Sequence, residues 1–270
     1  MALFYALLKN MKKAKTRKQA LEALAALRAE YAIRHAISGF NMDFDEAIDL
    51  LKNTDNLSEE DSEKRDRLVA AVDNLTEFAA CAEYQLMKDV YAVDPNFDFD
   101  NDDLDFDDED AMSDYVKLCE KYNKVYAAVE NSDIEYAMAM AWRWLRWNSE
   151  TYLTYMTQND DRVRPWHYAL QGFTAKRDDF PAWMIPPIEW GCRCFLVNDS
   201  NYYSKLDIRN VQAKAPEKPK ELDGVFAESV CKCGRIFSKS HHYFNIDKKD
   251  ARMLKGIVKN IRKVYYGKKD

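Results

Sequence analysis

Apolar residues recur every three or four positions through much of the first 93 residues, which is the spacing of an amphipathic helix. The pattern predicts helices over 16–37 and 43–52. It also predicts a longer helix that begins after Ser58, whose side chain can cap it. Residues 1–93 are therefore predicted to form a helical N-terminal region.

The second half of the chain mixes helical and strand patterns. Helices are predicted over 111–129 and from Ser132 onward, where Ser132 and Glu135 form a capping box. Residues 151–157 are β-branched and aromatic and predict a strand, and 194–198 predict a second one. Only seven glycines and seven prolines occur in 270 residues, which argues against an all-β fold. The predicted class is α+β: a mostly helical N-terminal region, then a compact domain of helices with a small, mainly antiparallel sheet.

Charge is concentrated in blocks, within a net charge of −6. Residues 94–114 carry eleven carboxylates and no basic residue, which is typical of an acidic linker. Residues 248–270 carry nine basic residues against two acidic ones. The predicted organisation is a helical region at 1–93, an acidic linker at 94–110, a compact domain at 111–245 and a basic C-terminal helix at 246–270.

The composition and the N-terminus indicate a soluble protein of the cytoplasm. No run of about 18 uncharged apolar residues is present, so we expect no membrane span. The apolar N-terminal run precedes its lysines, which is the reverse of a secretory signal. The six cysteines are then expected to be reduced, with Cys81 and Cys119 acting as small buried apolar residues.

A block of uncommon residues between Asp160 and Cys194 carries the most specific signal. It reads DDRVRPWHYALQG at 160–172, followed by Pro186-Pro187 and GCRC at 191–194. In this order and spacing it resembles the Mu F-like minor head proteins of tailed phages. A segment at 226–244 also resembles the part that closes the family domain. The matching motif positions are Asp161, Arg162, Arg164, His167, Leu170, Gly172, Pro186, Pro187, Gly191, Cys192, Arg193 and Cys194.

The resemblance implies a minor capsid or head morphogenesis protein of a tailed phage or prophage. Such a protein acts in procapsid assembly, or in DNA packaging or ejection near the portal. It implies portal or capsid proteins as partners, contact with packaged DNA, and a place in the virion after assembly in the host cytoplasm. Two alternatives stay open on the residues alone, a zinc-dependent nuclease and a non-specific DNA-binding protein.

Signatures of known catalytic sites are missing from the sequence. It contains no Ser-His-Asp arrangement, HExxH, glycine-rich phosphate loop or nuclease HNH spacing, so we predict no catalytic residues and no enzyme activity. Arg162 and Arg164 are expected to form ion pairs beside Asp160 and Asp161 at the end of a strand. A phosphate contact is the alternative role for these arginines.

Two Cys-x-Cys pairs leave the question of metal open. In an extended strand, Cys192 and Cys194 project to the same face, and a disulfide between them would be strained. Cys231 and Cys233 form the second pair, with His241 and His242 beyond it. We predict a reduced, packed cluster without a cofactor. The alternative is zinc held by Cys192, Cys194, Cys231 and Cys233, or by one pair together with histidines.

The basic C-terminal helix is a candidate surface for nucleic acid. Its apolar stripe is expected to dock on the protein and to leave cations outward for non-specific contacts with phosphates. A solvated helix without a ligand is the alternative. The candidate residues are Lys248, Lys249, Arg252, Lys255, Lys259, Arg262 and Lys263.

Overall fold

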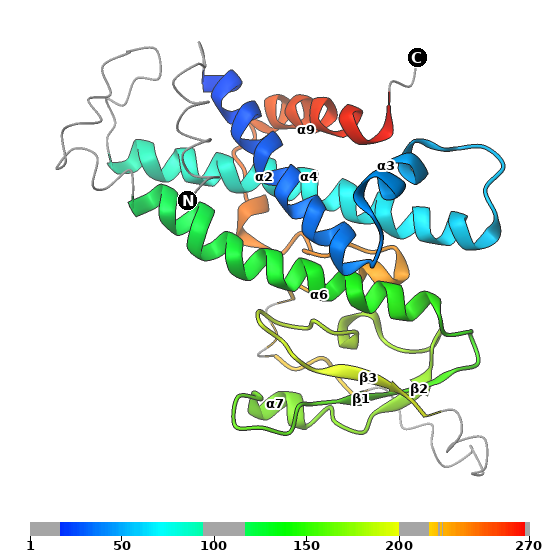
Figure 1. Cartoon of the computed structure of the whole chain (residues 1–270). Helices are drawn as coiled ribbons and strands as arrows, with labels where there is room; N and C mark the ends of the chain where they lie inside the picture. Colours follow the sequence, from blue (N-terminus) through cyan, green and yellow to red (C-terminus); the bar gives the residue numbers. More distant parts are fainter. Residues whose placement is uncertain (1–16, 94–116, 200–215, 221, 223, 268–270) are drawn as a thin grey trace. The chain divides into compact units, whose positions relative to one another are not determined.

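The computed structural model describes residues 17–93, 117–199, 216–220, 222 and 224–267 (Figure 1). These residues divide into two compact units, each built from separate stretches of the chain. The first contains the described residues of Met1–His35, Val72–Asn131 and His241–Asp270, and the second those of Ala36–Ala71 and Ser132–Ser240. The units therefore do not coincide with the predicted ranges 1–93 and 111–245. The predicted acidic linker lies outside the described residues.

Helices dominate the described chain, and the predicted α+β class is confirmed. The α-helices are α2 (Arg17–Gly39), α3 (Phe44–Lys52), α4 (Glu59–Val93), α6 (Ala127–Leu145), α7 (Pro165–Tyr168) and α9 (Ala251–Tyr266). A π-helix (Lys121–Tyr126) precedes α6, and short 3₁₀ turns occur at Ala182–Met184, Val230–Lys232 and His242–Phe244. The strands are β1 (Tyr152–Met156), β2 (Thr174–Lys176) and β3 (Phe195–Asn198).

The observed starts of α4 and α6 can be compared with the helix caps predicted at Ser58 and Ser132. The Ser58 hydroxyl accepts the Asp61 N–H at 3.0 Å, which confirms the predicted cap of α4. The predicted start at Ser132 is wrong, because α6 begins at Ala127 and continues through that residue. Glu130 and Asp133 on either side are both buried, so tertiary contacts carry the helix through a segment of weak helix propensity.

In the first unit, α9 packs beside α2 and α4 (Figure 1). Arg262 pairs with Asp73 of α4 at 3.1 Å, and Asn260 donates to Glu22 of α2 at 2.8 Å. The predicted apolar stripe of α9 is confirmed as buried; it consists of Leu254, Ile257, Val258, Ile261 and Tyr265. The predicted burial of Cys81 and Cys119 is also confirmed.

The second unit contains a three-stranded antiparallel sheet in the order β2-β1-β3 (Figure 1). Leu153 of β1 lies opposite Ala175 of β2, and Met156 pairs with Phe195 of β3. Both predicted strands are present. The edge strand β2 was not predicted, because its three residues are too few to show a period-2 pattern.

Gly39, at the end of α2, packs directly against the α6 backbone. A Cβ added there would lie 2.2 Å from the Glu135 carbonyl oxygen. We expect Gly39→Ala to destabilise the second unit by about 3 kcal/mol, because two helix backbones must move apart. Urea unfolding followed by tryptophan fluorescence measures this effect, since all six tryptophans lie in 142–190, within that unit.

Gly256→Ala is the matched control for this substitution. Gly256 lies inside α9, and an added Cβ has no neighbour within 4 Å. We therefore expect no loss of stability in the second unit and a gain of about 1 kcal/mol in the first, which contains α9 and is followed by far-ultraviolet circular dichroism, from the higher helix propensity of alanine. Wild-type stability in Gly39→Ala would show that the close approach of α2 and α6 is not a constraint.

Candidate metal centre

The motif block at 160–194 forms two loops that the sheet brings together. The first loop follows β1 and includes the short helix α7, and the second spans 186–194 and leads into β3. Because Met156 at the end of β1 pairs with Phe195 at the start of β3, the two loops begin and end side by side. Met156 and Phe195, 39 positions apart in sequence, thereby become neighbours across the sheet.

Two arginines join the loops. Nε of Arg164 lies 2.8 Å from Oε2 of Glu189, and the same guanidinium donates to the Trp190 carbonyl at 2.8 Å. Arg193 of the second loop in turn forms an ion pair with Asp160 of the first loop at 2.8 Å. These ion pairs cross between loops rather than forming within the DDRVR stretch. Asp161 and Arg162 are exposed at the surface.

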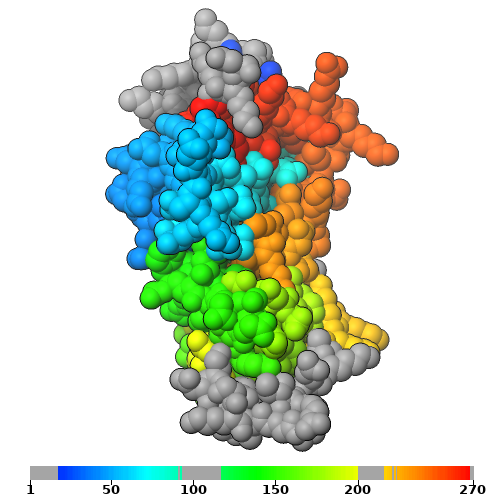
Figure 2. Space-filling model, turned by 90° about the vertical axis from the view of Figure 1, so that its right-hand side faces the viewer, coloured from blue at the N-terminus to red at the C-terminus, as the bar shows by residue number. Residues whose placement is uncertain are grey.

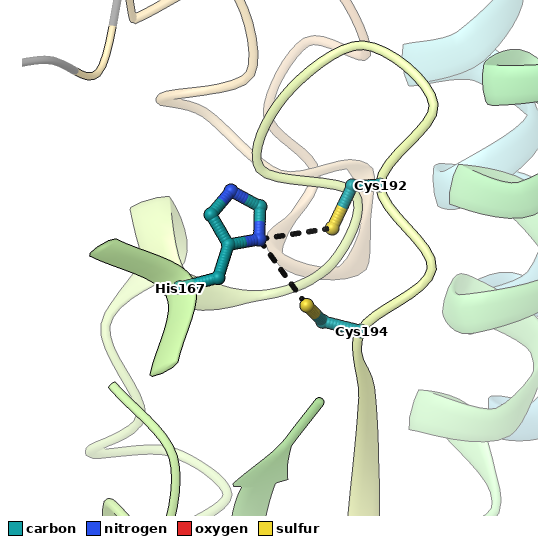
Figure 3. Close-up of side chains that lie close together, drawn as sticks. All are labelled: His167, Cys192 and Cys194. Carbon is teal, nitrogen blue, oxygen red and sulfur yellow. Dashed lines mark hydrogen bonds between the residues drawn. The ribbon is translucent and has the colours of Figure 1, made fainter. Parts of the chain in front are cut away.

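The side chains of His167, from the first loop, and of Cys192 and Cys194, from the second, point toward one another (Figure 3). Nδ1 of His167 lies 3.2 Å from Sγ of Cys194 and 3.9 Å from Sγ of Cys192. The three side chains are 2–4% exposed. On the other edge of the ring, Nε2 lies 3.4 Å from Oε2 of Glu189. The imidazole is thus placed between two thiols and one carboxylate.

The shared environment shifts the pKa values of the two thiols in opposite directions. A hydrogen bond from Cys194, and a second interaction with His167, hold the pKa of the Cys192 thiol well below its usual range despite burial. The pKa of Cys194 is raised, because its proton is retained in the bond to Cys192 and because it is buried. Burial, and then the two neighbouring cysteines, raise the pKa of the Tyr155 hydroxyl. The site therefore favours one buried thiolate beside a neutral phenol.

Asp133 of α6 fixes the turn that presents the cysteines. Its two carboxylate oxygens accept the Gly191 N–H at 3.0 and 3.1 Å. Gly191 has a φ of +64°, a conformation that favours glycine at this position. Burial raises the pKa of Asp133 to about 7, against the opposing effect of the Gly191 hydrogen bond. This contact holds the backbone next to Cys192.

The remaining motif residues contribute to the loops through burial and backbone conformation, and not through polar side chains. Leu170 is buried, and Gly172 has a φ of +85° while its N–H donates to the Tyr155 carbonyl at 2.8 Å. Pro186 and Pro187 are buried and joined by a cis peptide bond. Sequence reasoning missed Glu189, although it lies within the PPIEWGCRC stretch next to the cysteines. Asp133 and Tyr155 lie too far from the motif for any local pattern to indicate them.

The second cysteine pair does not join this cluster. Among the described residues, the ligand atoms that lie within 4.8 Å of one another belong to His167, Cys192 and Cys194. Burial raises the pKa of Cys231 to about 12, so its thiol stays protonated. Cys233 is exposed and accepts from Arg67 at 2.5 Å. Among the described residues the structure thus groups Cys192 and Cys194 with His167, and not with Cys231 and Cys233 as in the four-cysteine alternative.

The basic helix exposes most of the predicted nucleic-acid residues. Arg262 is the exception, because it donates to the Asp73 carbonyl at 2.6 Å and ties α9 to α4. Figure 2 shows side chains from the start of α9 and the residues before it, in orange-red, projecting from the surface. The exposed cations are Lys248, Lys249, Arg252, Lys255, Lys259 and Lys263.

Comparison with known proteins finds a family match over the motif block. Residues 110–197 match the family model described as Phage Mu protein F like protein. The resemblance to the Mu F-like family is confirmed. The matched range contains both loops and all three residues of the cluster, whereas the segment at 226–244 lies outside it.

One curated relative is similar to this chain over a short stretch. A stretch of 57 residues is 42% identical to the Mu-like prophage FluMu F protein of Haemophilus influenzae. It covers 20% of this chain and 14% of that protein. No solved structure matched the chain significantly. Within the described parts of the chain, no helix combines the length and apolar character that a membrane span requires.

Proposed function

We propose that this chain is a minor head protein of a tailed phage or prophage that acts in procapsid assembly or in DNA packaging near the portal. The observation that carries the proposal is the match of 110–197 to the Mu F-like family, together with the folding of its motif into two linked loops. Portal or capsid proteins are the partners, and the virion is the place of action.

The proposed role is structural rather than enzymatic. His167 is 2% exposed and is engaged by two thiols and a carboxylate, so its ring is poorly placed to act on a polymeric substrate. Contact with packaged DNA is a separate role that the six exposed cations on and before α9 favour. These cations suit binding to phosphates without reading the bases.

Mass spectrometry of particles tests the assignment. In a phage or induced prophage that carries this gene, we expect the chain in purified procapsids or virions, at low copy number relative to the major capsid protein. The terminase large subunit, which acts on the head without being part of the mature particle, serves as the carry-over control. Absence of the chain from both procapsids and virions, while it is expressed in the same lysate, would overturn the proposal.

A further inference from the structure

The His167–Cys192–Cys194 cluster has the composition of a transition-metal site. Thiolate sulfur and imidazole nitrogen together are a donor set that favours zinc among the common divalent ions. We propose that His167 through Nδ1, and Cys192 and Cys194 through their sulfurs, bind one zinc ion, and that Glu189 positions the histidine. This inference does not depend on the proposed role in the phage head.

The distances suit tetrahedral coordination. With Zn–S bonds of about 2.3 Å and a Zn–N bond of about 2.0 Å, a tetrahedral ion separates the nitrogen from each sulfur by about 3.5 Å. The observed separations from Nδ1 are 3.2 Å and 3.9 Å, on either side of that value. The three ligand atoms all lie within 4.8 Å of one another. Small side-chain movements therefore complete the site without a change in the backbone.

The histidine is oriented as a metal ligand. A ligating imidazole commonly donates its second N–H to a carboxylate, which fixes the tautomer and leaves the other nitrogen free to bind the ion. Here Nε2 faces Oε2 of Glu189 at 3.4 Å, and Nδ1 faces the sulfurs. Arg164 holds the same carboxylate oxygen at 2.8 Å, so the orienting group is itself fixed.

Tyr155 places a hydrogen-bond donor beside the two sulfurs. It is fully buried, and among the described residues its hydroxyl has no nitrogen or oxygen partner. Its hydroxyl interacts with the Cys194 thiol, and Cys192 is the other neighbour. A buried phenol O–H in this position is a suitable donor to a metal-bound thiolate, whose charge the ion compensates. Three protein ligands leave the fourth position of the ion to water.

Zinc analysis of the full-length protein tests the site. Protein prepared without chelator is expected to contain about one zinc per chain. Replacement of zinc by Co²⁺ should give thiolate-to-metal charge-transfer absorption together with the visible bands of tetrahedral cobalt. Cys192→Ser and His167→Gln are expected to lose the metal. Cys231→Ser, which changes an equally buried cysteine outside the cluster, is the matched control and should retain it.

The positioning role of Glu189 is tested by the zinc affinity of a Glu189 variant. Glu189→Gln keeps the size of the side chain but weakens the contact with Nε2. We expect zinc affinity, measured by competition with a chromogenic chelator, to fall about 10- to 100-fold while the charge-transfer bands persist. Complete loss of the metal would instead show that Glu189 is required for binding itself, and an unchanged affinity would remove it from the site.

Wild-type protein provides a test that does not depend on whether the variants fold. Cysteine alkylation at a urea concentration that partly opens the second unit, followed by peptide mass spectrometry, is expected to show Cys192 and Cys194 protected in the zinc-loaded protein. Both should become reactive after chelation, with Cys233 reactive in each case because it is exposed. The proposal is overturned if zinc and cobalt binding are absent from wild type, or if Cys231→Ser abolishes binding as Cys192→Ser does.

Discussion

Arg28→Met is expected to destabilise the first unit by about 3–5 kcal/mol, which is a large part of the stability of a typical domain. Arg28 of α2 is 5% exposed, and its guanidinium lies 3.1 Å from Glu83 and 2.5 Å from Glu130. Methionine fills the volume but leaves two buried carboxylates without their cation. The cost is that of removing one partner from a buried ion network, which exceeds the net contribution of the intact network.

The backbone around Arg28 is adapted to the same network. The guanidinium also donates to the Tyr122 carbonyl at 3.3 Å and to the Asn123 side chain at 3.2 Å, both within the π-helix. A π-helical turn has a wider hydrogen-bond spacing than an α-helix, which makes its carbonyls accessible to outside donors. Tyr243 donates to Glu130 at 3.1 Å and adds the segment before α9 to the network.

Two further variants separate the charge from the packing. Arg34→Met removes an arginine from the same helix, where a 52% exposed side chain forms a surface pair with Glu30, and should change stability by less than about 0.5 kcal/mol. Adding Glu83→Gln and Glu130→Gln to Arg28→Met should recover most of the lost stability, because no buried charge then lacks a partner. Urea unfolding followed by far-ultraviolet circular dichroism measures all three proteins. Equal stability of Arg28→Met and Arg34→Met would contradict the prediction.

The helices could be predicted because their signals are local. The cap at Ser58 and the buried stripe of α9 depend on residues a few positions apart, so the sequence contains them in full. The Arg28 network could not be predicted, because Glu83 and Glu130 lie 55 and 102 positions away. The composition of the two units was missed for the same reason, since each unit collects segments that the chain order separates.

In the candidate site, too, the motif residues could be identified from the sequence but their long-range partners could not. The resemblance singled out His167, Cys192 and Cys194, and the structure brings these three together. The residues alone offered Cys231 and Cys233, or the histidines at 241 and 242, as the alternative partners of these cysteines, because a repeated Cys-x-Cys was the visible pattern. The pairing of β1 with β3 decides the matter, since it places the His167 loop, and not the 231–233 turn, beside Cys194. Sheet register of this kind is a long-range property that spacing does not encode.

His241 is expected to make the first unit sensitive to acid. Its ring is 2% exposed, and burial, followed by the charges of His242 and Arg28, lowers its pKa from 6.5 to about 3. The folded protein therefore keeps the ring neutral, whereas the unfolded chain takes up a proton below pH 6.5. The stability that depends on His241 is present above pH 6.5 and is lost as the pH falls towards 3. Between pH 7 and pH 4.5 the loss from this group is about 3 kcal/mol.

His241→Asn isolates this contribution from that of the carboxylates. Nδ1 of His241 accepts the Tyr243 N–H at 3.1 Å, and the Asn side-chain oxygen can accept the same bond without titrating. The difference in unfolding free energy between pH 7 and pH 4.5 should therefore be about 3 kcal/mol smaller in the variant than in wild type. Phe78→Leu, which alters a ring 5.0 Å from His241, is the control and should lower stability by a similar amount at both pH values. If His241→Asn and wild type lose the same stability between the two pH values, the buried histidine is not a source of acid lability.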